Sequence, residues 1–218
     1  GQTDPFSAEQ STDDGTVSSK ALASDGSIII NDGTVTVTAS FEALEAPYIE
    51  VNGGTLDLTS SDDGINVTGG ETDSLVINGG TIVINAGGDG LDINGSGTMN
   101  NGTVTIYGPE NAGNGSLDYD GSFTVNGGTL IAGSAAGMLM TPSDTSAVRT
   151  AVIGVTDTSS AVEIEDEDGN TILSYTSDKS WSVVEFSSEL LETGKTYTVV
   201  QNGTKLGTIS ADDTVSYI

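Results

Sequence analysis

The chain lacks cysteine and histidine altogether, and its 218 residues include only 5 lysines and arginines. Without cysteine, disulfide bonds cannot stabilise the fold. Without histidine, the catalytic arrangements in which an imidazole activates a serine or a cysteine are excluded. The absence of both residue types also removes the usual ligands of zinc and copper.

The shortage of basic side chains restricts the possible partners. There are 32 acidic residues against 5 basic ones, and the formal net charge is −27. Phosphate binding needs clustered lysine and arginine, so we expect no nucleic-acid partner. No apolar run approaches the roughly 18 residues of a membrane span, so we expect no membrane insertion. A surface this acidic instead attracts divalent cations.

The residues that are abundant form a repeat. The pattern Asn-x-Gly-Thr occurs five times, beginning at Asn31, Asn52, Asn78, Asn100 and Asn126. Spacings of 21, 26, 22 and 26 residues are typical of solenoids and too short for a propeller blade of about 40 residues. Apolar residues alternate around each copy, which predicts three short strands per repeat. The sequence therefore predicts an all-β fold, a single-stranded parallel β-helix with three strands per rung.

The asparagines that begin the repeats should stack. We expect them to form an internal amide ladder at a corner of the coil, with the following glycines supplying positive φ. Residues 19–156 are predicted to form the β-helix, and residues 1–18 a tail or a degenerate rung. Residues 157–218 change to hairpins, with a type I′ turn at Asp168-Gly169, and predict a small antiparallel β cap.

The acidic residues fall into two columns when the repeats are aligned on the apolar column of Leu22, Leu44, Ile65, Leu91 and Leu117. Two residues earlier stand Lys20, Glu42, Asp63, Asp89 and Gly115, and one residue later stand Ala23, Glu45, Asn66, Asp92 and Asp118. Like charges on neighbouring strands destabilise a sheet. A Ca²⁺ ion, which takes 6–8 oxygen ligands, would remove that cost. We therefore predict calcium, held by Glu42, Glu45, Asp62, Asp63, Asn66, Asp89 and Asp92; the alternative is a solvated acidic face.

Four further residues are candidates for other roles. Asp118 ends the outer acidic column and is a candidate glycan ligand. Tyr48 and Tyr107 offer aromatic platforms within the repeats, whereas Tyr119 is expected to point inward. Lys20 is the one basic residue of the repeats, and we expect it to form an ion pair with Glu42.

Several phrases resemble a known family. Ser40-Phe41-Glu42-Ala43-Leu44-Glu45-Ala46-Pro47, Val51-Asn52-Gly53-Gly54-Thr55-Leu56 and Ser61-Asp62-Asp63-Gly64-Ile65-Asn66 are similar to the bacterial carbohydrate-binding-domain-containing β-helix family, which is distantly similar to pectate lyases. The resemblance extends over about residues 19–140. It implies a right-handed coil that holds Ca²⁺, lies outside the cell or on its surface, and binds plant cell-wall polysaccharide such as polygalacturonate and cellulose.

Three functions follow as hypotheses. The leading one is a non-catalytic, monomeric carbohydrate-binding protein in which calcium bridges the acidic columns and the carboxylates of the glycan. An enzyme alternative is a calcium-dependent pectate lyase with Lys20 as its base. A structural alternative is an adhesin stalk in which calcium serves only rigidity.

Overall fold

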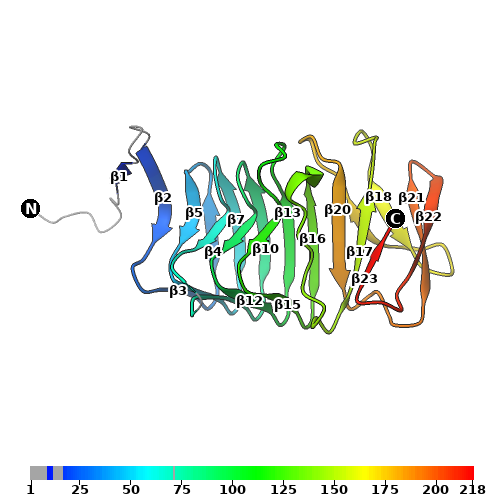
Figure 1. The fold of residues 1–218 in the computed structure, drawn as a ribbon, viewed down its shortest axis with the longest axis horizontal. Coiled ribbons are helices and arrows are strands. Elements are labelled where there is room, and N and C mark those ends of the chain that lie inside the picture. The colour runs from blue at the N-terminus through cyan, green and yellow to red at the C-terminus, as the bar shows by residue number, and fades with distance from the viewer. Residues whose placement is uncertain (1–8, 12–16, 71) are drawn as a thin grey trace, which may run out of the picture.

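The strands of this protein stack along one long axis, and further strands close the C-terminal end (Figure 1). The computed structural model describes residues 9–11, 17–70 and 72–218. All regular structure in these ranges is β, apart from the short 3-10 turn η1 (Ala136–Met138). The all-β class and the solenoid are confirmed.

Three sheets run along the axis. The first, here called the acidic sheet, contains β1 (Glu9–Ser11), β2 (Val17–Ala23), β5 (Glu42–Glu45), β8 (Ile65–Val67), β11 (Leu91–Ile93) and β14 (Leu117–Tyr119). The second, the basal sheet, contains β3 (Ser27–Ile30), β6 (Tyr48–Val51), β9 (Ser74–Ile77), β12 (Ser96–Met99) and β15 (Phe123–Val125). The third, the broad sheet, begins with β4 (Thr34–Val37), β7 (Thr55–Ser60), β10 (Thr81–Ala86), β13 (Thr103–Tyr107) and β16 (Thr129–Ser134).

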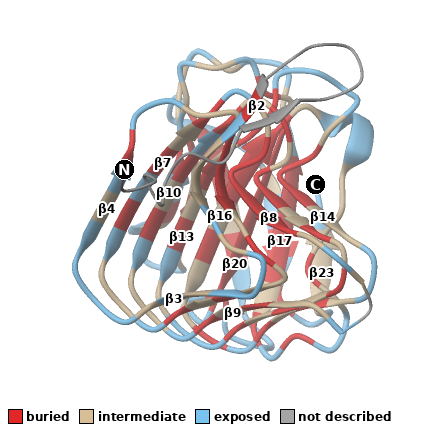
Figure 2. Ribbon diagram, turned by 90° about the vertical axis from the view of Figure 1, so that its left-hand side faces the viewer, coloured by how far each residue is buried: buried red, intermediate tan, exposed pale blue. Residues whose placement is uncertain are grey.

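From β2 to β16, neighbouring strands of each sheet pair in parallel with like residues opposite one another, whereas β1 pairs antiparallel with β2. In the acidic sheet the register places Leu44 beside Ile65, Ile65 beside Leu91, and Leu91 beside Leu117. These side chains are fully or almost fully buried in the solenoid core. Figure 2 shows the matching alternation of buried and exposed residues along β4, β7, β10 and β13. The predicted alignment of the repeats is therefore confirmed.

The asparagine ladder forms, but on the outside of the coil. Each side-chain Nδ2 donates to the Oδ1 of the preceding rung over 2.8–3.1 Å, and the ladder contains Asn31, Asn52, Asn78, Asn100 and Asn126. All five residues are exposed, so the prediction of an internal ladder was wrong. The asparagine side chains point to solvent, because the apolar residues before and after each asparagine fill the interior of the coil.

The glycines at the third position of the repeat adopt the predicted positive φ, from +80° at Gly128 to +102° at Gly102. A Cβ atom on Gly128 would lie 2.4 Å from the carbonyl oxygen of Gly102 on the rung before. Glycine is thus needed here both for its backbone conformation and for the close stacking of the turns.

The C-terminal region adds two elements to this coil. β20 (Val183–Ser188) pairs antiparallel with β16, and β17 (Arg149–Gly154) and β23 (Val215–Tyr217) extend the broad sheet beyond it. A separate antiparallel sheet, the cap sheet, contains β18 (Val162–Glu165), β19 (Thr171–Tyr175), β21 (Thr196–Gln201) and β22 (Thr204–Ser210).

These cap strands share a second hydrophobic core with β17 and β20, around Phe186, Val199 and Trp181. Ala151 and Ile153 of β17 belong to it, although they lie within the range predicted for the β-helix. The boundaries at residues 18 and 156 stay predictions, and residues 1–8 and 12–16 lie outside the described part of the chain. No helix in the described ranges is long and apolar enough to cross a membrane.

The hairpin between β18 and β19 differs from the predicted type I′ turn, which needs positive φ at both central residues. Gly169 has φ +81°, whereas Asp168 has a negative φ. The carboxylate of Asp166 explains the difference, because its Oδ1 accepts hydrogen bonds from the backbone N–H groups of Asp168 (3.0 Å) and Asn170 (2.8 Å). This side chain holds a wider loop in which the two-residue turn cannot form.

Candidate functional site

The candidate site lies at the corner where the chain passes from the broad sheet to the acidic sheet. Two glycines shape this corner. A Cβ on Gly64 would lie 2.3 Å from Cγ2 of Ile84, and one on Gly90 would lie 2.4 Å from Cγ2 of Ile106. The chain therefore touches the core at each glycine, and the aspartate that precedes it, Asp63 or Asp89, is placed at the corner.

Three carboxylates meet at this corner, and we call them the acidic cluster: Glu42, Asp62 and Asp63. One oxygen of each lies within 4.8 Å of the other two. It is the one group of three acidic side chains arranged to hold a metal ion among the residues that the structure describes. Gly88 leaves room for it, because a Cβ there would come within 2.5 Å of Oδ1 of both Asp62 and Asp63.

Hydrogen bonds link the cluster to the next rungs. Oδ1 of Asp63 accepts from the backbone N–H of Asp89 at 2.7 Å, and Oδ1 of Asp89 accepts from the N–H of Gly115 at 2.6 Å. Two buried side-chain oxygens of the acidic sheet accept no hydrogen bond: Oε2 of Glu42, which lies 3.7 Å from Nζ of Lys20, and Oδ1 of Asn66. Both are hard oxygen donors that a cation could satisfy.

Burial and mutual repulsion make these carboxyl groups reluctant to ionise. Burial, followed by the hydrogen bond and the charge of Glu45, raises the pKa of Glu42 to about 8. Burial is also the main cause that raises the pKa of Asp63 to about 7 and that of Asp92 to about 6. Burial raises the pKa of Asp89 as well. Protonation, above all of Glu42, relieves the cost of burying these charges.

Lys20 is the basic residue of this corner. Its Nζ lies 2.9 Å from Oε2 of Glu45 and 3.7 Å from Oε2 of Glu42, and its side chain is 7% exposed. Burial lowers the pKa of Lys20, but the hydrogen bonds and charges of the two glutamates outweigh this and raise it. Burial likewise raises the pKa of Glu45, and its hydrogen bonds with Glu42 and Lys20 outweigh that and lower it. The predicted ion pair with Glu42 is confirmed, and Glu45 shares it.

The seven predicted metal ligands thus occupy different places. Glu42, Asp62 and Asp63 come together, Glu45 faces Lys20, and Asp89 lies on the next rung. Asn66, Asp92 and Asp118 stand side by side on β8, β11 and β14 in the predicted register. The charges of Asp89, Asp118 and Asp120 all act on Asp92, so this second row is close to the corner.

The alignment of the acidic columns did not indicate Asp120 or the groove beside this row. The groove has a volume of about 680 Å³ and is lined by Gly69, Gly70, Asn94, Gly95, Asp120 and Gly121. The signal for it was the recurrence of Gly69, Gly95 and Gly121 every 26 residues. Gly69 and Gly121 are exposed there, whereas Gly95 between them is buried.

The tyrosines lie apart from the acidic cluster. Tyr48 is on the basal sheet, and its hydroxyl donates to Oε2 of Glu50 at 2.7 Å. Tyr107 ends β13 on the broad sheet, and its ring centroid lies 5.7 Å from that of Tyr175. Tyr119 packs against the solenoid core as predicted, and its hydroxyl donates to the carbonyl of Thr141 at 2.8 Å.

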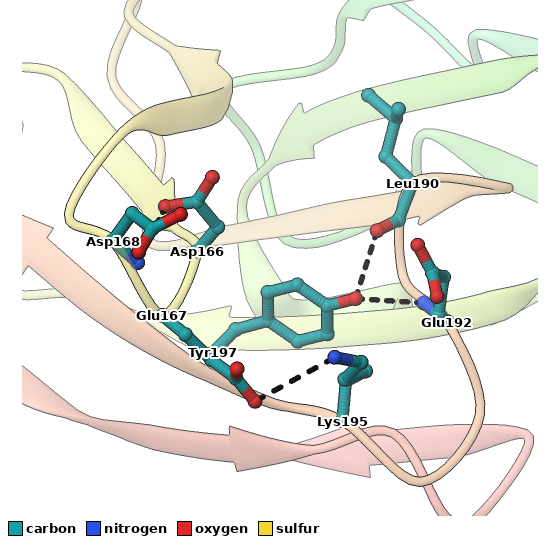
Figure 3. Close-up of polar contacts among 7 residues, drawn as sticks. All are labelled: Asp166, Glu167, Asp168, Leu190, Glu192, Lys195 and Tyr197. Atoms are coloured by element: carbon teal, nitrogen blue, oxygen red, sulfur yellow. Dashed lines mark hydrogen bonds and ion pairs between the residues drawn. The ribbon is translucent and has the colours of Figure 1, made fainter.

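A further acidic pocket of about 300 Å³ lies on the cap (Figure 3). Asp166 and Asp168 lie on one side of the ring of Tyr197 and Glu192 on the other, so the carboxylates do not converge. The hydroxyl of Tyr197 donates to the carbonyl of Leu190 at 2.9 Å and accepts from the N–H of Glu192 at 2.8 Å. These contacts support the turn before β21, and we assign the pocket no ligand.

Part of the chain matches a known protein family. Residues 2–64 match a family described as carbohydrate-binding domain-containing protein. The matched segment includes the acidic cluster and Lys20, and it ends before Asp89, Asp92 and Asp118. No curated protein and no solved structure matches the chain. Similarity to a carbohydrate-binding family thus coincides with the part of the chain that gathers three carboxylates.

Proposed function

We propose that this chain is a non-catalytic, calcium-dependent carbohydrate-binding protein, secreted or held on the surface of a bacterium. Its ligand is plant cell-wall polysaccharide, chiefly acidic chains such as polygalacturonate. One observation carries the proposal: the carboxylates of Glu42, Asp62 and Asp63 converge within 4.8 Å, inside the segment that matches a carbohydrate-binding family. The proposal includes a right-handed coil with three strands per rung and a monomeric protein.

The chemistry of the corner suits calcium. Carboxylate and amide oxygens without nitrogen or sulfur are the ligands that hard cations prefer. Glu42, Asp62 and Asp63 would hold the ion, and Asp89 and Asn66 offer further oxygens on neighbouring rungs. A bound divalent ion would add positive charge to that of Lys20, which pairs with Glu42 and Glu45.

The acidic chain requires such an ion to bind an acidic polysaccharide. A protein of net charge −27 repels the carboxylates of a uronate chain. This repulsion is stronger at partly buried sites, where the effective dielectric constant is lower than in water. Three protein carboxylates occupy only part of the 6–8 positions of Ca²⁺, so coordination positions remain for the oxygens of a sugar. In this proposal the residues of the corner bind and orient the ion, and the glycan completes its coordination.

The enzyme alternative would use Lys20 as the base of a lyase. A base must be neutral to accept a proton. The contacts with Glu45 and Glu42 raise the pKa of Lys20 and keep it protonated, and its side chain is almost fully buried. These observations favour an ion-pairing role for Lys20 and support the non-catalytic proposal.

The proposal is tested by retention of the protein on polygalacturonate, with calcium and with excess chelator. We expect calcium-dependent retention and no absorbance from unsaturated lyase products. The double variant Asp62→Asn, Asp63→Asn should lose about tenfold or more in calcium affinity, because a hard cation binds an amide oxygen less well than a carboxylate. Asp57→Asn is the matched control, because Asp57 is exposed on β7 of the broad sheet.

Each result separates the alternatives. Retention that survives the chelator, or that is unchanged in the double variant, would contradict the calcium mechanism. Unsaturated product that disappears in Lys20→Ala would make the protein a lyase. Calcium-dependent melting without retention on any glycan would indicate the stiffened scaffold.

A further inference from the structure

A third cavity, after the groove and the acidic pocket of the cap, lies where the cap meets the outer face of the broad sheet. Its volume is about 360 Å³, at the lower end of the usual range for ligand pockets of about 300–1,000 Å³. It is lined by Asn85, Tyr107, Thr176, Ser177, Asp178 and Lys179. Two of these residues come from the solenoid and four from the loop that follows β19.

The solenoid side of this pocket follows from the register of β10 and β13. Asn85 pairs with Tyr107, and their neighbours Ile84 and Ile106 point into the core, so both side chains face outward. The next position in the row is Gly133 on β16. The ring of Tyr175 fills the space above Gly133, because a Cβ there would lie 2.2 Å from it.

The aromatic side chains at this junction form a row. Tyr107 contacts Tyr175, and Trp181 packs edge-on against Tyr175 with ring centroids 5.0 Å apart. Tyr175 and Trp181 are buried in the cap core, whereas Tyr107 is only half-buried. Tyr107 is therefore the aromatic residue that the row presents to the pocket.

Lys179 fixes the loop side of the pocket. Its Nζ donates to the carbonyl of Tyr107 at 3.2 Å and to the carbonyl of Ala86. The loop is held again one residue later, where the N–H of Ser180 donates to Oε1 of Glu110 at 2.7 Å. Both contacts join the cap to residues at least 70 positions earlier in the chain. The pocket is therefore a built site with two tethered walls.

The charges around this pocket do not favour an anion. The ammonium of Lys179 donates to two backbone carbonyls and feels the negative charge of Glu110. The Asp178 carboxylate lies in the same lining. The remaining groups are a tyrosine ring, an amide and two hydroxyls. A neutral sugar has hydroxyls for the polar groups and a face of C–H groups for the ring.

We propose that this pocket binds a neutral pyranose residue of a glycan, independently of calcium. The ring of Tyr107 packs against the C–H face of the sugar, and the Asp178 carboxylate and the Asn85 amide bind its hydroxyls. The inference rests on the proposed carbohydrate-binding function and adds a second subsite with a different ligand class.

The pocket and the acidic cluster are close along the chain. Ala86, whose carbonyl accepts from Lys179, is two residues before Gly88, which packs against the carboxylates of Asp62 and Asp63. A single turn therefore separates the two sites. A polysaccharide that contains both neutral and acidic residues would contact the two sites together.

The test is calorimetric titration of the full chain with cellohexaose and with trigalacturonate, each with calcium and with chelator. We expect cellohexaose to bind equally with and without calcium. Tyr107→Ala should weaken it about tenfold, equivalent to about 1.4 kcal/mol, and Asp178→Asn should weaken it several-fold. Tyr217→Ala, which removes an exposed tyrosine outside the pocket, should have no effect.

The outcomes distinguish this inference from the proposed function. Tyr107→Ala removes a packing contact with Tyr175 as well as the sugar platform. Asp178→Asn changes an exposed residue of the pocket and therefore tests sugar binding without disturbing that packing. Cellohexaose binding that is unchanged in both variants, or abolished by the chelator, would overturn the neutral subsite. Calcium-dependent binding of trigalacturonate alone would overturn the subsite and leave the proposed function standing. Binding of neither sugar would contradict both.

Discussion

The solenoid and the cap are both built of β-strands, but they use side chains differently. In the solenoid, like residues lie over like residues in a parallel register, so a group at one position recurs on the next rung. In the cap, antiparallel strands bring unlike residues together, and each polar contact occurs once. The parallel stack therefore gathers carboxylates at the acidic corner. The antiparallel C-terminal strands instead isolate single groups, such as Glu185 on β20.

The largest expected effect comes from alanine at matched glycines of the two regions. Gly128 in the solenoid has φ +80° and Gly169 in the cap has φ +81°. A side chain on Gly169 meets nothing within 4 Å, whereas one on Gly128 would collide with the backbone of Gly102. Gly169→Ala should cost about 1–2 kcal/mol for the left-handed conformation alone. Gly128→Ala should cost about 2–5 kcal/mol, because overpacking adds to that strain.

Urea denaturation of the two glycine variants measures this difference. Equal losses would mean that the rungs can separate enough to admit a methyl group, and close stacking would then not distinguish the solenoid from the cap. A second rung gives an internal check. Gly102→Ala should behave like Gly128→Ala, because its Cβ would lie 2.8 Å from the carbonyl oxygen of Gly80.

The second prediction concerns pH and compares Glu185 with the acidic cluster. Glu185 on β20 is 1% exposed, burial raises its pKa well above the ordinary value, and its Oε2 accepts no hydrogen bond in the described region. The folded chain keeps it protonated to a higher pH than the unfolded chain, which ionises it above about pH 4. Stability is therefore lost as the pH rises from that point. Glu185→Gln should be more stable than the parent by about 1–3 kcal/mol at pH 8 and by little at pH 4.

Adding calcium distinguishes the effect of Glu185 on stability from the effect of the acidic cluster. The carboxyl groups of the corner also have raised pKa values, so without calcium they too destabilise the folded chain as the pH rises. Calcium should remove that penalty at pH 8 and leave the benefit of Glu185→Gln unchanged. Melting temperatures at pH 5 and pH 8, with calcium and with chelator, provide the measurement. If calcium abolished the gain in melting temperature of Glu185→Gln, Glu185 and the acidic cluster would act as one site, and the prediction would be wrong.

The smallest expected effect comes from exposed asparagines. Asn78→Ala removes two ladder bonds of 2.8 Å to rungs on both sides, and should cost about 1–2 kcal/mol. Asn170→Ala removes side-chain bonds to Asp166 within one loop of the cap, and the backbone bond at 2.8 Å remains. It should cost about 0.5 kcal/mol. Hydrogen exchange should report faster opening across several rungs in the first variant and only at the hairpin in the second.

The same contrast explains which features the sequence could predict. The columns of Glu42, Asp63 and Asp89 followed from counting repeats, because a parallel stack places equivalent residues side by side. Counting repeats did not predict that the asparagines point outward, because periodicity does not show on which side of a corner a side chain lies. The loop at Asp166 depends on one carboxylate that accepts several N–H groups, which the Asp-Gly pattern does not indicate.

The contacts of the cap were beyond prediction for a further reason. Lys179 donates to carbonyls 72 and 93 residues earlier in the chain. No repeat relates the cap to the solenoid, so no alignment of the sequence with itself could pair them. The pocket lined by Tyr107 and Lys179 therefore could not be predicted from the sequence.

The asparagine ladder has an electrical consequence. Every amide in it donates from the later rung to the earlier one, so all of the side-chain dipoles point the same way. Aligned amides add their dipoles, as peptide units do in a helix, and each bond polarises the next. The row presents amide N–H groups at Asn31 and a carbonyl oxygen at Asn126. The solenoid thus has a positive and a negative pole along this edge, generated by uncharged residues.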